Sequence, residues 1–234
     1  MNKWYELEEL EKHHINHYAQ DGEDGLLEYI FKNIEPRTKF AVEFGAGQSS
    51  RIHGTLNVKW LVEKFGWECV MWEINKKKIT YPLSYIYKET VTPENVNDLF
   101  EKYKVPKEVD VVVIDVDGQD YWIWKSLEWK PQIVEIEFNT KLGFLENKVM
   151  EKDSEHYKIR DPKSASYGAS VLALKKLGTE KGYTMIDRCG RNLFFVLNEF
   201  VEEGYDVDIN DLDFYVTKAD RPRVFDKDKK WVEV

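Results

Sequence analysis

The sequence predicts an α/β fold, a three-layer sandwich around a seven-stranded, mostly parallel sheet that ends in an antiparallel hairpin. Two observations predict it. From residue 39 to residue 197, short β-branched runs alternate with helix-like or loop segments, which is typical of parallel strands joined by crossovers on both faces. The last two apolar runs instead flank Arg188-Cys189-Gly190-Arg191, which is the pattern of a hairpin.

The elements follow in order along the chain. The expected parallel strands span 40–44, 68–74, 84–89, 109–116 and 133–138, and the hairpin strands span 183–186 and 192–197. The expected helices span 57–64, 92–103, 120–127 and 169–181. Thr92 followed by Pro93 predicts an N-cap with Pro at the first helical position. Gly66 is placed to close the first of these helices in a left-handed conformation.

Composition excludes several classes of protein. The chain has 234 residues, with 34 Lys and Arg against 43 Asp and Glu, a net charge of −9. This field repels phosphate backbones and anionic lipid headgroups, so we expect neither a nucleic-acid nor a membrane partner. Cys69 and Cys189 stand far apart in apolar runs, as inert buried thiols do. Acids near the first residue, and no run of about 18 apolar residues, predict a cytoplasmic location.

The chain divides into three parts. Residues 1–38 are expected to form a helical segment that packs on a ligand crevice, and residues 39–198 are expected to form the core. Within the core, the polar stretch 140–166 is too long for an ordinary connection, which predicts an active-site lid or a mobile loop. Its bases favour an anionic ligand group, although its acids offset much of that charge. Residues 199–234 are expected to be a mixed-charge surface appendage.

The sharpest local motif is Val42-Glu43-Phe44-Gly45-Ala46-Gly47, a strand that runs into two glycines. Glycines there allow a tight turn and a close approach of the backbone to a ligand, and a plain turn is the alternative. A dinucleotide fingerprint would need Gly or Ala at position 50, where Ser50 stands, and this weakens a nicotinamide interpretation. Glu43 lies near the end of a strand expected to be buried, where its desolvation rarely suits a structural role.

Further polar residues end the neighbouring strands. Glu73 ends the second strand, where a carboxylate can accept both hydroxyls of a ribose; a surface acid at a frayed strand end is the alternative. Residue alternation places Asp115 with Asp117 on one face of the fourth strand, and Glu137 with Asn139 on one face of the fifth. Because open α/β sheets bind ligands beyond the carboxyl ends of their strands, these groups should converge with Glu43. Helix caps and loop hydrogen bonds are the alternative.

The turn after the fourth strand carries Gln119 and Tyr121, whose amide and ring suit a substrate-binding rim. Asp120 in the same turn has a second interpretation as the cap of the helix that follows. His53 and His156 stand in predicted loops near the crevice and are weaker acid–base candidates.

These motifs together resemble the class I S-adenosylmethionine-dependent methyltransferases. The acid-x-Gly-x-Gly motif, the acids that end the second and fourth strands and the terminal hairpin carry that resemblance. Six further segments resemble the FkbM-related branch: Gln20-Asp21-Gly22-Glu23-Asp24-Gly25, Thr92-Pro93-Glu94-Asn95-Val96-Asn97, Ile114 to Trp122, Ile136-Glu137-Phe138-Asn139, Tyr167-Gly168-Ala169-Ser170 and Asn192 to Val196. Gln48-Ser49-Ser50 departs from the continuation that some relatives have.

The resemblance implies a Rossmann-like fold and S-adenosylmethionine as the cofactor. It implies a methionine end beside the glycine motif, a ribose on Glu73, an adenine by the turn 89–92 and a sulfonium over Asp115. The cofactor-binding residues are then Gln20, Glu43, Gly45, Ala46, Gly47, Glu73, Thr90 and Asp115. A carboxylate-lined crevice also suits a cationic sulfonium on physical grounds.

The expected reaction is methyl transfer to a hydroxyl or amino group of a small molecule or sugar derivative, with phosphorylated or otherwise anionic acceptors among the candidates, in surface-polysaccharide or natural-product tailoring. The catalytic candidates are Asp117, Glu137 and Asp115, and the substrate-binding candidates are Gln119, Tyr121, Asn139, His156 and Tyr167. No metal is expected, although these acids with Asn139 also resemble the magnesium site of catechol-type methyltransferases. An NAD-type oxidoreductase and a non-catalytic binding protein are the competing hypotheses.

Overall fold

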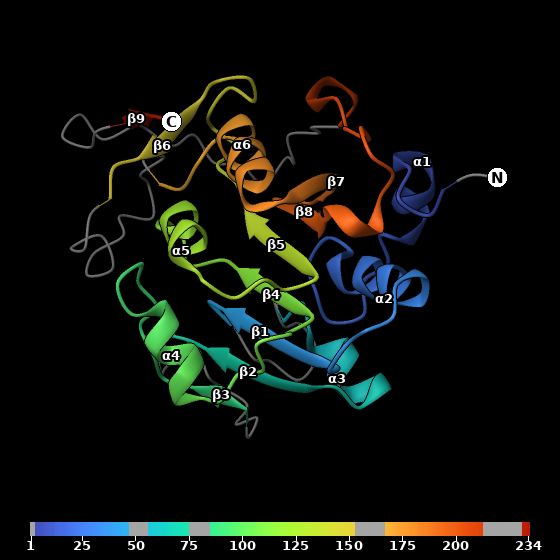
Figure 1. Ribbon diagram of the computed structural model, residues 1–234, viewed down its shortest axis with the longest axis vertical. Coiled ribbons are helices and arrows are strands. Elements are labelled where there is room, and N and C mark those ends of the chain that lie inside the picture. The colour runs from blue at the N-terminus through green and yellow to red at the C-terminus, as the bar shows by residue number, and fades with distance from the viewer. Residues whose placement is uncertain (1–2, 47–55, 75–84, 153–166, 213–230) are drawn as a thin grey trace.

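The computed structural model describes residues 3–46, 56–74, 85–152, 167–212 and 231–234. Its main sheet has seven strands in the order β3-β2-β1-β4-β5-β8-β7 (Figure 1). The strands are β1 Phe40–Phe44, β2 Glu68–Trp72, β3 Ile86–Tyr87, β4 Val111–Ile114, β5 Ile133–Glu137, β7 Tyr183–Cys189 and β8 Asn192–Leu197. Strands β1 to β5 pair in parallel, and β8 is antiparallel to both of its neighbours. The predicted fold class and strand number are confirmed.

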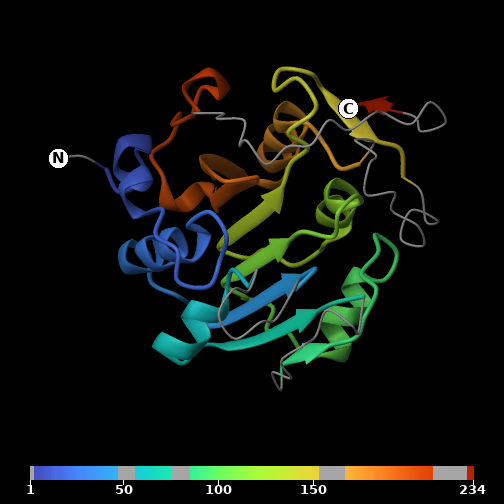
Figure 2. The same ribbon diagram turned by 180° about the vertical axis from the view of Figure 1, so that it is seen from behind.

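Helices cover both faces of this sheet, as Figures 1 and 2 show. They are α1 Leu7–Leu10, α2 Glu23–Asn33, α3 Lys59–Phe65, α4 Val96–Lys102, α5 Asp120–Ser126 and α6 Val171–Lys181, with 3-10 turns at Glu11–His13, Asn198–Phe200 and Ile209–Asp211. One core lies under α4, α5 and α6, and a second lies under α1, α2 and α3. In the described part of the chain, no helix combines the length and the apolar character needed to cross a bilayer.

Alternating residues of the central strands divide between the two cores, as the sequence predicts. Val112 and Ile114 of β4 contribute to the core under α4 to α6, whereas Val111 and Val113 contribute to the other. Glu135 of β5 faces the second core and is completely buried. A carboxyl group there needs hydrogen-bond donors, because burial without them costs several kcal/mol, on the order of 2–7 for a neutral polar group.

Three helix starts differ from the prediction. Helix α3 begins at Lys59 rather than at residue 57. Helix α4 begins at Val96 rather than beside Thr92, because the Asn95 side chain accepts a hydrogen bond from Thr92 N (2.8 Å) and donates one to Thr90 O (2.8 Å). These bonds close a turn over residues 92–95, so the helix begins after that turn. Helix α6 starts at Val171, capped by the Ser170 hydroxyl. The predicted end of α3 is confirmed, since Gly66 follows it with φ 69°.

The stretch 140–166 is not wholly a loop. Strand β6, Lys148–Met150, lies within it and pairs antiparallel with β9, Trp231–Glu233. This two-stranded sheet joins segments that are far apart in the chain, so no local pattern could predict it. Residues 153–166 lie outside the described part. Val207, Ile209 and Leu212 are buried in the core. The part of the chain after residue 199 is therefore not only a surface appendage, as predicted, but also contributes to the core.

Candidate functional site

Four acids meet at the carboxyl edge of the sheet. Glu43 is the next-to-last residue of β1, Glu73 and Asp115 directly follow β2 and β4, and Glu137 ends β5. Glu43, Glu73 and Glu137 are buried, and Asp115 is half-buried. A pocket opens at this edge and is lined in part by Glu43, Gly45, Asp115, Glu137 and Arg191. The structure therefore confirms that these acids lie together at the carboxyl edge of the sheet.

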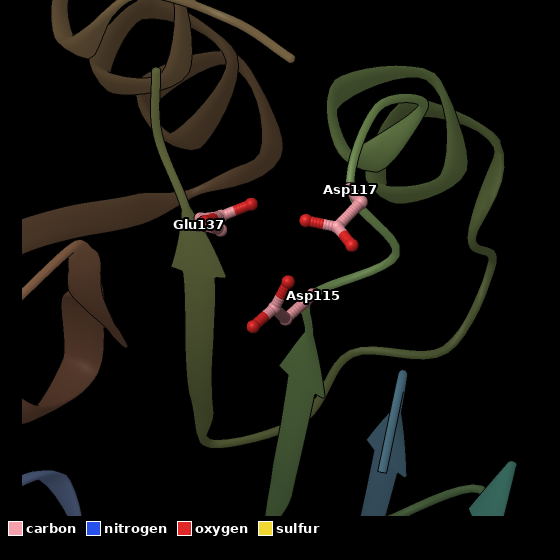
Figure 3. A group of neighbouring side chains, drawn as sticks. All are labelled: Asp115, Asp117 and Glu137. Atoms are coloured by element: carbon pink, nitrogen blue, oxygen red, sulfur yellow. The ribbon is translucent and has the colours of Figure 1, made fainter. Parts of the chain in front are cut away.

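Asp115, Asp117 and Glu137 point toward one another above β4 and β5 (Figure 3). Each offers a carboxylate oxygen, and the three oxygens lie within 4.8 Å of one another. Burial and the neighbouring Asp115 hold the pKa of Glu137 well above its usual range, whereas Arg191 opposes that shift, with Nη1 3.5 Å from Glu137 Oε1. Like charges this close disfavour simultaneous ionisation, so the group can hold a proton or share a cation. Oxygen donors of this type also suit Mg²⁺.

Gly45 brings β1 against the end of β4. Its φ is 68°, and a β-carbon on it would lie 1.6 Å from the carbonyl oxygen of Asp115. The amides of Gly45 and Ala46 both donate to Trp72 O, at 2.9 and 3.2 Å. Only glycine fits this approach, so the motif joins the ends of three strands. Gly47 and Ser50 lie outside the described residues.

Glu43 holds the chain that returns from the glycine motif. Its carboxylate accepts hydrogen bonds from Asn57 N (3.2 Å) and Val58 N (3.1 Å). Burial raises the pKa of Glu43 to about 8, although these two bonds oppose the shift. These two main-chain donors thus offset part of the free-energy cost of burying the Glu43 carboxyl group.

Behind Glu43 lies a hydrogen-bonded network of residues that are not among the predicted site residues. The Asn57 side chain donates to Glu135 Oε1, and Asn192 Nδ2 donates to the same oxygen (2.9 Å) and to Glu23 Oε1 (3.3 Å). Glu135 Oε2 has no hydrogen-bond partner among the described residues. Burial raises the pKa of Glu23 to about 7. Glu135 lies in the middle of a buried strand, so its desolvation cost is the same sequence signal that marks Glu43.

The N-terminal segment contributes Gln20 and Asp21 to the pocket. Buried Asp24 fixes this segment by accepting hydrogen bonds from the amides of Tyr18 (2.6 Å) and Ala19 (3.2 Å), and from that of His17 (3.1 Å). A carboxylate that gathers three successive N–H groups sets the path of the chain. Gln20 itself is exposed at the pocket wall.

Two of the substrate-binding candidates, Gln119 and Asn139, bind main chain through their side chains, and a third, Tyr167, supplies one of the acceptor carbonyls. Gln119 Nε2 donates to Glu151 O (3.3 Å), and Asn139 Nδ2 donates to Tyr167 O (2.7 Å). These bonds anchor the chain on both sides of residues 153–166, which include His156 and lie outside the described part, as His53 does. They thereby bring both anchored ends next to the acidic edge.

Tyr121 and Thr90 lie apart from this pocket. The Tyr121 ring is buried in the core under α4 to α6, with an edge-to-face contact to Trp122 at 5.0 Å, rather than at a substrate rim. Thr90 is half-buried in the turn before α4. Residue type alone suggested an aromatic wall at Tyr121, but α5 turns this side chain inward.

Comparison with known proteins gives likeness at the level of fold. No family model matches the chain, and no curated protein matches its sequence. The N-terminal domain of EvdMO1 with SAH bound is 10% identical, with a TM-score of 0.44 over 76% of this chain and 80% of that chain. A SAM-dependent methyltransferase from Archaeoglobus fulgidus is 16% identical, with a TM-score of 0.41 over 69% and 67%. MycE, a methyltransferase of mycinamycin biosynthesis in complex with Mg and SAH, is 14% identical, with a TM-score of 0.45 over 76% of this chain and 50% of that chain.

Proposed function

We propose that the protein is an S-adenosylmethionine-dependent methyltransferase that acts on a hydroxyl or amino group of a small molecule or sugar derivative. The observation that carries the proposal is the set of acids that end β1, β2, β4 and β5 along one edge, beside the Gly45 turn. Open α/β sheets bind ligands at this edge, and negative groups there suit a cationic sulfonium. The antiparallel β8 between β5 and β7 also supports a methyltransferase over an NAD-type sheet.

The cofactor is proposed to lie across the ends of β1, β2 and β4. Glu73 would accept the two ribose hydroxyls, because its two carboxylate oxygens match vicinal donors. Asp115 would lie under the sulfonium, with Gly45 and Ala46 beside the methionine end and Gln20 at the outer wall. Glu43 would act mainly by holding residues 57 and 58 in place. Gly47 and Thr90 complete the proposed set.

The reaction proposed is an in-line displacement. The acceptor oxygen or nitrogen attacks the methyl carbon, the carbon–sulfur bond breaks, and S-adenosylhomocysteine leaves with the electron pair. Glu137, which lines the pocket, or Asp117, whose carboxylate oxygen lies within 4.8 Å of that of Glu137, takes the acceptor's proton. The protein's main contribution is alignment of the two reacting atoms.

For the acceptor, we propose a hydroxyl-bearing compound such as a sugar, in the FkbM-related manner of surface-polysaccharide or natural-product tailoring. Two of the described bases in the stretch 140–152 form ion pairs: Lys148 lies 2.8 Å from Glu146, and Lys152 lies 2.7 Å from Glu94. A phosphorylated or acidic acceptor would therefore draw on Arg191, which lines the pocket, or displace these pairs.

The test is the thermal stability of the purified protein with S-adenosylhomocysteine and, separately, with NAD. Ligand at about 100 times its Kd should stabilise the protein by about 2.7 kcal/mol. We expect a shift with S-adenosylhomocysteine that is lost in Glu73→Ala and kept in Glu101→Ala, an exposed acid paired with Lys107. A shift with NAD instead would contradict the proposal.

Turnover is tested with a methyl-labelled donor and a panel of hydroxyl and amino acceptors. Glu137→Gln keeps the side-chain shape and removes the base, so we expect S-adenosylhomocysteine binding to persist while turnover falls. Tight binding without turnover on any acceptor would instead support a non-catalytic binding protein.

A further inference from the structure

Asp117 has an unusual backbone conformation. Its φ is 61°, in the left-handed region that residues other than glycine rarely adopt. Asp tolerates this region better than most residues, yet it still needs surrounding interactions to keep it there. In this conformation the Asp117 carboxylate points toward those of Asp115 and Glu137 (Figure 3).

The Asp120 carboxylate accepts hydrogen bonds from the N–H groups of the residues before and after Asp117. Its Oδ1 accepts a hydrogen bond from Val116 N (2.7 Å), and its Oδ2 accepts one from Gly118 N (2.8 Å). Asp120 is buried, with 1% of its surface exposed, so solvent does not compete for these bonds. One carboxylate thus fixes two N–H groups that flank the strained residue.

Asp120 is not the N-cap of the helix that follows, which is its alternative interpretation from the sequence. Helix α5 begins with Asp120 as its first residue, after Gln119 at the N-cap position, and Gln119 makes no capping hydrogen bond with its side chain. The Asp120 side chain instead turns back toward β4. On its other side the same turn is held by Gly168, whose amide donates to Gly118 O (3.1 Å).

We propose that Asp120 is a positioning residue, which holds Asp117 in its left-handed conformation and so places the Asp117 carboxylate beside Asp115 and Glu137. Asp120 holds this turn whatever reaction the protein catalyses. Its catalytic meaning rests on the proposed methyl transfer, in which Asp117 and Glu137 border the acceptor.

A double-mutant cycle in thermal stability tests the structural part. Asp120→Asn keeps the shape but replaces one acceptor oxygen by an NH₂ group that faces a main-chain donor. We expect it to lower Tm by about 3–8 °C. In an Asp117→Gly background the same change should lower Tm by less than half as much, because glycine adopts φ 61° without stabilising hydrogen bonds from Asp120. Equal losses in the two backgrounds would overturn the inference.

Kinetics test the catalytic part. Asp120→Asn should lower kcat on the order of 100-fold, as misplacement of a reacting group does, while the Kd for S-adenosylhomocysteine stays within about twofold. Asp98→Asn is the matched control, because Asp98 is an exposed acid in the first turn of α4, and it should leave kcat unchanged. A wild-type kcat in Asp120→Asn would overturn positioning. If the wild type bound no S-adenosylhomocysteine, the proposed function would fail, and the stability cycle would still decide the role of Asp120.

Discussion

The carboxyl groups of Glu43 and Glu135 lie on the same face of the sheet, one on each side of Val113, and Asn57 joins them. Strand register places Glu43 and Glu135 opposite Val113 on β1 and β5. Asn57 donates its main-chain N–H to Glu43 and its side-chain amide to Glu135. A residue next to the glycine motif is thereby fixed to the interior of the sheet.

Removal of the Asn57 side chain should weaken both the fold and ligand binding. Asn57→Ala leaves Glu135 with fewer donors, so we expect urea unfolding to show a loss of about 1–3 kcal/mol. The affinity for S-adenosylhomocysteine should fall too. Asn97→Ala is the control, since Asn97 bonds Ser126 O and Glu128 N (3.0 Å each) away from the pocket. It should affect stability only; unchanged ligand affinity in Asn57→Ala would contradict the link.

Stability should fall as pH rises from 5 to 8. The pKa of Glu43 is raised to about 8 and that of Glu23 to about 7, mainly by burial, from ordinary values of 4.5. The folded protein therefore binds more protons than the unfolded chain between these values. The stabilisation is fully present below pH 4.5 and is lost as pH rises through the folded pKa, by up to about 1.4 kcal/mol per pH unit for each group. Urea titrations should show a shallower slope in Glu43→Gln; an identical slope would refute the assignment.

Two glycine substitutions should differ sharply. In Gly45→Ala, the new methyl group would overlap Asp115 O, so β1 and β4 must separate at the site. In Gly66→Ala, the methyl group meets nothing within 4 Å, and only the positive φ opposes it. We expect Gly66→Ala to lose about 1 kcal/mol and Gly45→Ala to lose much more, or not to fold, by circular dichroism and urea unfolding. Comparable losses would mean that the Gly45 contact relaxes easily.

Methyl transfer should not require a divalent cation. Arg191 already supplies positive charge beside Glu137, 3.5 Å from its Oε1. We therefore expect turnover to survive EDTA and dialysis, and Arg191→Gln to lower it more than Arg188→Gln on the neighbouring strand. Turnover that is lost with EDTA and restored by Mg²⁺ would contradict this expectation and would assign Asp115, Asp117 and Glu137 as metal ligands.

Much of the fold follows from local pattern. The β-branched runs locate β1 and β5 to within one residue, whereas β4 is two residues shorter at each end than the predicted 109–116. The alternation of these runs correctly divides Val111 from Val112. Strand β3 is shorter than predicted, because only Ile86 and Tyr87 pair with β2. Strands β6 and β9 were missed, since each is short and its partner is remote in sequence.

The site was predictable in position but not in detail. Topology requires that residues such as Asp115 and Glu137 meet at one edge, whatever their surroundings. The partners of a carboxylate depend instead on which N–H groups the folded chain brings near it. Asp24 and Asp120 gather main-chain donors, which neither residue type nor spacing reveals. Buried acids in this protein thus shape loops as well as line the pocket.

The pairing of β6 with β9 has a consequence for the order of folding. The ribosome releases Lys148–Met150 long before Trp231–Glu233, so β6 can pair with the segment around Ala169 but not with β9 while the seven-stranded sheet assembles. Ring closure over such a long stretch is entropically slow. The small sheet should therefore be a late event in refolding, and amide protection of Val149 should appear after that of Val113.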